Sequence, residues 1–145
     1  MNKTPNYQLN QWDKSDRIQM EDFNADNAKI EAALETIPKV TYGTYLGNGA
    51  ESRMIEIGFM PKLVYVCPTK GFTYYSSGLY HSYCGGLAMQ DTPLLAQAYD
   101  GTESPVLSVT ETGFFVHYRV FNVNSDQYTV ASNENGVEMR YFAFG

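Results

Sequence analysis

Apolar positions change their period at about residue 40, and this change divides the sequence into two parts. Before it, apolar residues recur at spacings of three and four; after it, short runs of Tyr, Phe, Val and Thr are separated by Gly, Asn and Asp. The first period indicates an α-helix and the second indicates β-strands. We therefore expect an N-terminal arm and oligomerisation helix over residues 1–39 and a β-sandwich head over residues 40–145.

The only convincing helical segment covers residues 20–37. Alanine and other good helix formers fill it, and Glu21 and Asp22 lie at the end where the helix dipole favours carboxylates. Pro38 then stops the helix. Residues 1–19 carry scattered apolar side chains without a regular period, so we expect an extended arm that lies against another surface.

One face of this predicted helix carries an apolar stripe that is interrupted by an amide. Its members follow a four-three spacing: Phe23, Asn27, Ile30, Leu34 and Ile37. In heptad terms Asn27 takes an a position, where a single polar residue weakens a coiled coil but fixes its register and number of chains. Since only about two heptads are present, the spacing leaves two partners open: copies of the helix, or the chain's own β-domain.

From residue 40 onward the sequence predicts about seven or eight short strands, and hence a β-sandwich or compact barrel. Asn48-Gly49 lies between two strand-like runs, residues 41–47 and 52–59, and favours a hairpin turn. The fuller apolar run at residues 61–67 is typical of a strand buried on both faces. The remaining predicted strands are residues 105–110, 113–123, 127–132 and 137–145. Between residues 68 and 93 the strand signal blurs.

Charge and composition narrow the possible functions. A formal net charge of −6, with only 10 Lys and Arg, argues against nucleic acid as a partner. No run approaches the roughly 18 apolar residues of a membrane span, and the N-terminus lacks the apolar core of a signal peptide. We therefore expect a protein made in the cytoplasm without signal peptide or membrane insertion. Cys67 and Cys84 alone cannot form a structural zinc site, and we interpret them as buried or half-buried thiols.

Residues that could carry catalysis are few. His81 and His117 are the only histidines; Ser76 or Ser82 could join one of them in a Ser-His-Asp arrangement, but no G-x-S-x-G motif is present. The acidic residues that could pair for glycoside cleavage lie in turn-like contexts typical of solvated carboxylates. These residues are Asp91, Asp100, Glu103, Glu111 and Asp126. Metal-binding motifs are also missing, so we expect no enzymatic activity, no metal site and no cofactor.

The strongest candidate for a binding site is the segment of residues 71–86, GFTYYSSGLYHSYCGG. Tyrosine gives a large contact area at little cost in rotamer entropy, and Ser and Gly allow close hydrogen bonding. Aromatic rings can also pack on the apolar faces of sugars. Together with a second loop, AYDGTES, the segment gives these candidate ligand-binding residues: Tyr74, Tyr75, Tyr80, His81, Tyr83, Tyr99 and Asp100. The alternative is that the tyrosines cover a subunit interface or a strand face.

Residues 6–34, NYQLNQWDKSDRIQMEDFNADNAKIEAAL, carry an N-Y-x-L-x-x-W motif followed by D-F-N-x-D-N-x-K-I-x-x-A-L. The β-part begins with YGTYLGNGAESRMIEIGFMPKLVYV and closes with NENGVEMRYFAFG. These segments resemble the N-terminal segment, and the start and the end of the C-terminal β-domain, of tail-fibre and receptor-binding-type structural proteins of phages and prophages of Firmicutes. Glu21, Met139 and Phe142 depart from these patterns, and residues 69–132 are not covered.

This resemblance implies a homotrimer, with the helices on the threefold axis and Asn27 fixing their register. It also implies that the N-terminus attaches to other tail or baseplate proteins of a virion or tailocin, and that the head contacts the bacterial surface. The expected function is that of an adhesin that recognises cell-surface carbohydrate. One alternative is a purely structural virion or baseplate component without a ligand, and a third possibility is a polysaccharide depolymerase.

Overall fold

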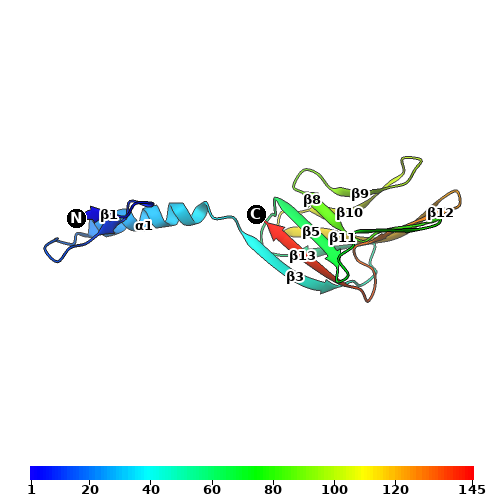
Figure 1. Cartoon of the computed structure of the whole chain (residues 1–145), viewed down its shortest axis with the longest axis horizontal. Coiled ribbons are helices and arrows are strands. Elements are labelled where there is room, and N and C mark those ends of the chain that lie inside the picture. Colours follow the sequence, from blue (N-terminus) through cyan, green and yellow to red (C-terminus); the bar gives the residue numbers. More distant parts are fainter. The chain divides into compact units, whose positions relative to one another are not determined.

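The computed structural model describes residues 1–145 and confirms a mainly β chain with one short N-terminal helix (Figure 1). The chain forms two compact units, residues 1–38 and residues 39–145. No helix combines the length and the apolar character that crossing a membrane requires.

The helix of the N-terminal unit, α1, spans Met20–Glu35. Its alanines favour the helical state, and two acidic residues lie in its first turn, where they complement the helix dipole. The helix ends two residues earlier than predicted, with Thr36 as its last, capping position. The reason is that Pro38 disfavours the helical conformation at Ile37, the residue before it.

The arm that precedes α1 folds back along the helix. Its strands β1 (Asn2–Lys3) and β2 (Asn10–Gln11) pair antiparallel, which the unpatterned sequence did not predict. The backbone N–H of Asn10 donates to the carboxylate of Asp26 at 2.8 Å, and the ammonium group of Lys29 donates to the carbonyl of Gln8 at 2.6 Å. The arm therefore covers the helix face that carries Asp26 and Lys29.

The apolar stripe of α1 stays exposed, although Tyr7 and Leu9 of the arm line a pocket together with Ile30, Leu34 and Ile37. Phe23, Ile30, Leu34 and Ile37 are between 42% and 60% exposed, and no residue of the helix is buried. Asn27, in the middle of the stripe, is exposed as well. An exposed apolar stripe of this kind is available to a partner.

The β-domain consists of two sheets. The four-stranded sheet has the order β3-β13-β5-β8 and is antiparallel throughout. Its strands are β3 (Val40–Leu46), β13 (Glu138–Phe144), β5 (Leu63–Pro68) and β8 (Gly86–Met89). The larger sheet has the order β6-β7-β12-β11-β10-β9, with β4 also paired to β11. Its strands are β4 (Ser52–Glu56), β6 (Tyr74–Ser77), β7 (Tyr80–Tyr83), β9 (Leu94–Gln97), β10 (Glu103–Val109), β11 (Gly113–Val123) and β12 (Asp126–Ala131).

Apolar side chains from both sheets meet in one core, as the predicted sandwich requires. Val64, Val66 and Met139 of the four-stranded sheet are fully buried, together with Leu107 and Phe114 of the larger sheet. Burying such side chains is the main term that stabilises a domain of this size. The prediction of a β-sandwich is therefore confirmed.

The predicted hairpin at Asn48-Gly49 is wrong. β3 pairs with β13 and β4 pairs with β11, so the segment between them crosses from one sheet to the other. The fully buried side chain of Asn133 holds this crossing. It accepts from the N–H of Asn48 at 3.2 Å, and it donates to the Asn48 side chain at 2.7 Å and to the carbonyl of Ala50 at 2.9 Å. Because Asn133 and Asn48 are 85 positions apart, the local turn motif could not reveal the crossing.

Two further differences concern the strands. The run at residues 61–67 is not buried on both faces: in β5, Val64 and Val66 are buried whereas Tyr65 is exposed, because only one face of the four-stranded sheet meets the core. The structure also adds four strands, β6 to β9, to the seven predicted runs. They lie where the strand signal blurred or just after it. Ser and Tyr give β6 and β7 little apolar alternation, and β8 and β9 are only four residues long.

Candidate functional site

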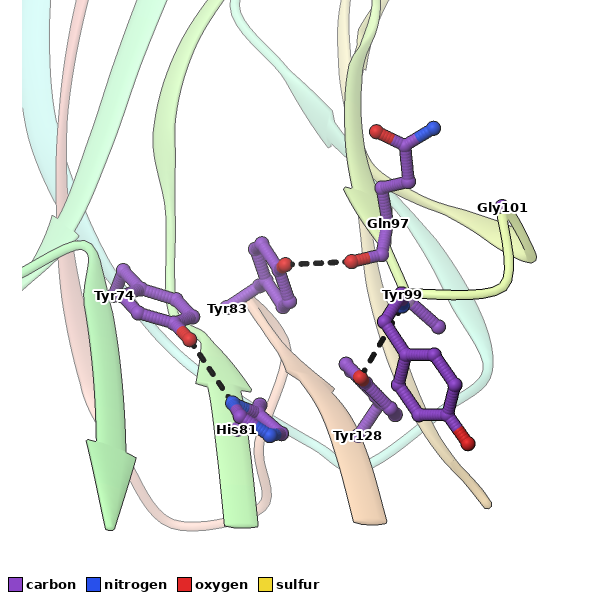
Figure 2. Close-up of a pocket in the computed structure, with 8 residues that line it drawn as sticks. Tyr74, His81, Tyr83, Gln97, Tyr99, Gly101 and Tyr128 are labelled. Carbon is purple, nitrogen blue, oxygen red and sulfur yellow. Dashed lines mark hydrogen bonds between the residues drawn. The ribbon is translucent and has the colours of Figure 1, made fainter. Parts of the chain in front are cut away.

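A cavity of about 450 Å³ lies beside the larger sheet (Figure 2). Three segments that are distant in the sequence line it: the β6–β7 hairpin, the end of β9 with the turn that follows, and β12. The lining residues are Tyr74, His81, Tyr83, Gln97, Ala98, Tyr99, Gly101 and Tyr128.

The register of the β6–β7 hairpin decides which of its side chains reach the cavity. A two-residue turn links the strands, and Gly78 takes a positive φ of 60° there, a conformation that glycine adopts without strain. Tyr74 pairs with Tyr83, and Ser76 pairs with His81. Because alternate residues of a strand point to opposite faces, these four side chains share one face of the sheet.

β12 lies parallel to β7 and places Tyr128 beside His81. The rings of His81 and Tyr128 stack with their centroids 4.8 Å apart, and Phe121 of β11 stacks on Tyr128 at 5.3 Å. Since β7 and β11 flank β12 on opposite sides, the two rings cover both faces of Tyr128, which is only 4% exposed. Tyr128 therefore supports the floor of the cavity more than it offers a free ring face.

The turn after β9 forms another wall. The N–H of Ala98 donates to the carbonyl of Thr102 at 2.8 Å, which closes the turn. The carboxylate of Asp100 accepts from the N–H of Thr102 at 2.9 Å, and this hydrogen bond lowers the pKa of Asp100. The N–H of Tyr99 donates to the hydroxyl of Tyr128 at 3.3 Å (Figure 2), so the turn is anchored to the floor of the cavity.

A hydrogen bond joins the two sides of the cavity (Figure 2). The hydroxyl of Tyr83 donates to the carbonyl of Gln97 at 2.9 Å. β7 and β9 lie near opposite ends of the strand order, so the larger sheet must curl to bring these residues together. Burial raises the pKa of Tyr83, and the phenol therefore keeps its proton and its role as a donor at neutral pH.

His81 is the centre of a small polar network. Its Nδ1 lies 3.0 Å from the hydroxyl of Tyr74 and 3.2 Å from that of Ser76, and its Nε2 lies 3.4 Å from the carboxylate of Asp126. The carboxylate accepts a hydrogen bond from Nε2–H, so in the neutral imidazole Nδ1 is the acceptor for both hydroxyls. Ser76, His81 and Asp126 thus follow the order of a Ser-His-acid relay. Tyr74 competes for the same nitrogen, so Ser76 is not singled out as a nucleophile.

Four of the seven candidate ligand-binding residues line the cavity: Tyr74, His81, Tyr83 and Tyr99. Tyr75 and Tyr80 lie on the opposite face of the hairpin, since strand alternation separates each from its lining neighbour. Asp100 belongs to the turn that carries Tyr99 but does not itself line the cavity.

Four of the eight lining residues were not among the candidates: Gln97, Ala98, Gly101 and Tyr128. Ala98 and Gly101 belong to the AYDGTES loop that carries Tyr99. Tyr128 and Val130 alternate along β12, which marks them as one face of a strand, but only the pairing with β7 brings that face to the hairpin. Gln97 contributes through its main-chain carbonyl, which no side-chain pattern can indicate.

The second histidine, His117, lies in β11 beside a separate pocket of about 290 Å³ that Glu51, Ser104 and Arg119 help to line. Its Nδ1 bonds to the carbonyl of Glu51 at 3.2 Å, whereas its Nε2 is buried without a partner. Burial lowers the pKa of His117, which favours the neutral imidazole. The two cysteines are free thiols: Cys84 is buried and Cys67 is half-buried, as expected.

The outer side of the four-stranded sheet carries two complete cross-strand rows of apolar residues. The first row consists of Tyr42, Phe142, Tyr65 and Leu87, and the second consists of Val40, Phe144, Leu63 and Met89. All four residues of the first row are exposed. Antiparallel sheets that face water on one side usually carry polar residues there, so this outer apolar face is a candidate docking surface.

No protein-family model, no curated protein and no solved structure matches the chain. Function must therefore be inferred from the residues and the geometry of the chain itself.

Proposed function

We propose that this protein is a non-enzymatic tail-fibre or receptor-binding component of a phage, prophage or tailocin particle, and that it attaches to carbohydrate on the bacterial surface. The tyrosine-lined cavity carries this proposal, because it combines aromatic rings with phenol hydroxyls and an imidazole. Aromatic rings pack on the apolar faces of sugars, and the hydroxyls bond to those of the ligand. The sequence resemblance to tail proteins supports the assignment to a particle.

Binding of fluorescently labelled full-length protein to intact Gram-positive cells and to purified wall polysaccharides tests the adhesin proposal. Tyr74→Leu removes a ring that lines the cavity, and Tyr75→Leu removes a comparably exposed ring from the opposite face; the two side chains are 49% and 55% exposed. We expect Tyr74→Leu to weaken binding roughly tenfold, the effect of losing one good aromatic contact. Tyr75→Leu should bind like the natural chain. Equal losses in both variants would contradict a role for the cavity.

We propose further that the particle contains this chain as a homotrimer joined by α1, with the N-terminal arm attached to other tail or baseplate proteins. The exposed stripe of Phe23, Ile30, Leu34 and Ile37 supports self-association, and three weak sites on one trimer would gain avidity. Sedimentation equilibrium should give a mass of three chains of 16.3 kDa each. Leu34→Asp should lower it to that of one chain. A monomer at micromolar concentrations of the natural chain would exclude the trimer.

The outer apolar face favours a second function, that of a purely structural component of the particle. A joining protein would cover this face with another subunit, and no ligand would be needed. Tyr42→Lys and Tyr74→Leu separate the two functions. A structural component loses incorporation into particles with Tyr42→Lys and is unaffected by Tyr74→Leu, whereas an adhesin loses cell attachment with Tyr74→Leu.

A further inference from the structure

We propose that the tyrosine cavity takes a methylated ammonium cation, such as the trimethylammonium head of choline, carried by the surface polymer that the protein binds. The identity of the polymer as a bacterial surface glycan rests on the proposed function. The choice of a cationic group rests on the charges and rings that surround the cavity.

The electrostatics of the cavity favour a positive ligand. None of its lining residues is Lys or Arg, whereas three carboxylates lie next to the lining. Asp126 is 3.4 Å from His81, Glu103 is 3.5 Å from the side-chain amide of Gln97, and Asp100 lies between the lining residues Tyr99 and Gly101. The lowered pKa of Asp100 keeps that carboxylate charged at neutral pH. These carboxylates would repel an anionic ligand.

The rings around the cavity suit a cation that needs no hydrogen bond. Tyr74 and Tyr83 lie with their centroids 5.0 Å apart, and Tyr99 lines the cavity as well. Cations bind to the electron-rich faces of such rings, and quaternary ammonium groups are commonly recognised by cages of this kind. The three cation–π pairs within the chain involve other rings, those of Phe59, Tyr45 and Phe121, so no Lys or Arg of the chain occupies the tyrosines of the cavity.

The hydrogen-bonding groups of the cavity point to a methylated rather than a primary ammonium. The carbonyl of Gln97 already accepts from Tyr83, and the hydroxyl of Tyr128 already accepts from Tyr99. A primary ammonium has three donors, which would compete with the chain's own donors for these oxygens. A trimethylammonium group has no such donors. The remaining volume of the cavity leaves room for the adjoining part of the polymer.

Titration calorimetry with choline chloride, and with its uncharged analogue in which carbon replaces the quaternary nitrogen, tests the charge requirement directly. The full-length protein is used at about pH 8, above the ordinary titration range of histidine, and at low salt. We expect choline to bind with a roughly millimolar dissociation constant and the neutral analogue to bind roughly tenfold more weakly. Equal affinities for the two compounds, or no binding of choline at tens of millimolar, would overturn the proposal.

Three variants locate the cation. Tyr99→Leu should weaken choline binding roughly fivefold to tenfold, whereas Tyr80→Leu, which removes an equally exposed tyrosine from the other face of the hairpin, should not; both side chains are 61% exposed. Asp100→Asn retains an acceptor for the N–H of Thr102 but removes the charge, so it should weaken choline binding and leave the neutral analogue unaffected. Thermal unfolding of each variant checks that the domain is intact. An effect of Tyr80→Leu equal to that of Tyr99→Leu would place any choline site elsewhere and overturn the proposal.

Parallel binding to whole cells and wall polysaccharides separates this inference from the proposed function. A protein that binds polysaccharide but discriminates neither choline nor its analogue is an adhesin for a neutral sugar, and only the cation proposal fails. A protein that prefers choline over the neutral analogue but binds no cell or polymer retains the cation site and loses the adhesin function.

Discussion

Both the β-domain and the helix α1 expose apolar side chains, but only the β-domain has a buried core. Phe114, Leu107 and Met139 are fully buried between the two sheets, whereas α1 has no buried residue at all. This difference indicates that a single chain supplies the whole core of the β-domain. A helix of 16 residues is marginal alone in water, and the arm leaves the apolar stripe of α1 exposed. The stability of α1 should therefore depend on a partner.

The largest effect should come from the core of the β-domain. Phe114→Ala leaves a cavity between the sheets and should lower the free energy of unfolding by about 3–5 kcal/mol. Phe23→Ala removes an exposed ring from α1, and in a chain kept monomeric by Leu34→Asp it should change that free energy by no more than about 0.5 kcal/mol. Urea unfolding followed by aromatic signals measures both. Similar losses would mean that the stripe of α1 is as well packed in one chain as the core is.

Removing the buried asparagine should lower the free energy of unfolding by somewhat less than removing Phe114 does, and removing the exposed asparagine should hardly change it. Asn133→Ala leaves the N–H of Asn48 and the carbonyl of Ala50 without their partner, which should cost about 2–4 kcal/mol. Asn27→Ala in the same monomeric background should cost little, because this side chain is exposed. The same urea titration gives both values. A loss below about 1 kcal/mol for Asn133→Ala would show that water replaces its hydrogen bonds and that the crossing does not depend on it.

The sequence predicted those parts of the fold that depend on local pattern. The strands of residues 103–144 follow from periodicity, because each buries one face along its own length. The helix follows from its helix-forming residues and from the spacing of its apolar stripe, although it buries no residue. The hairpin at Asn48-Gly49 was wrong because the energy that decides the path of β3 comes from β13 and Asn133, at the far end of the chain. A strong local turn signal cannot outweigh pairing with a distant strand.

The site was predictable in composition but not in geometry. The abundance of tyrosine in residues 71–86 made this segment the candidate site, and its hairpin lines the cavity. Which tyrosines face the cavity depends on the one-residue register of β6 and β7, which separates Tyr74 from Tyr75. Tyr128 joins the site only because β12 runs parallel to β7, and no local signal indicates that pairing.

A third prediction concerns the assembly state of α1. If Asn27 fixes register across copies, Asn27→Leu should raise the melting temperature of the assembled helix while allowing more than one number of chains. Native mass spectrometry measures the distribution of oligomers, and the helical circular dichroism signal gives the melting temperature. Leu34→Asp is the matched control and should abolish assembly. A single trimer of unchanged stability in Asn27→Leu would show that the amide has no role in register.

The smallest expected effect is on the pH dependence of stability, which His117 should give to the β-domain and not to α1. Burial lowers the pKa of His117 from its ordinary value of 6.5, so the unfolded chain binds this proton at a higher pH than the folded chain does. Stability therefore rises with pH in this window: the contribution is fully present above pH 6.5 and is lost as the pH falls through the lowered value. His117→Gln should flatten this part of the stability profile of the β-domain, measured by urea unfolding between pH 5 and pH 8.

The matched observation in that experiment is the helical circular dichroism signal of α1. Both histidines lie in the β-domain, so the helical signal should not follow the titration of His117 in either protein. A slope that persists in the β-domain of His117→Gln would assign the acid sensitivity to another group. A change of the helical signal in the same pH window would mean that the β-domain and α1 unfold as one unit, and the contrast between a self-sufficient domain and a dependent helix would then no longer hold.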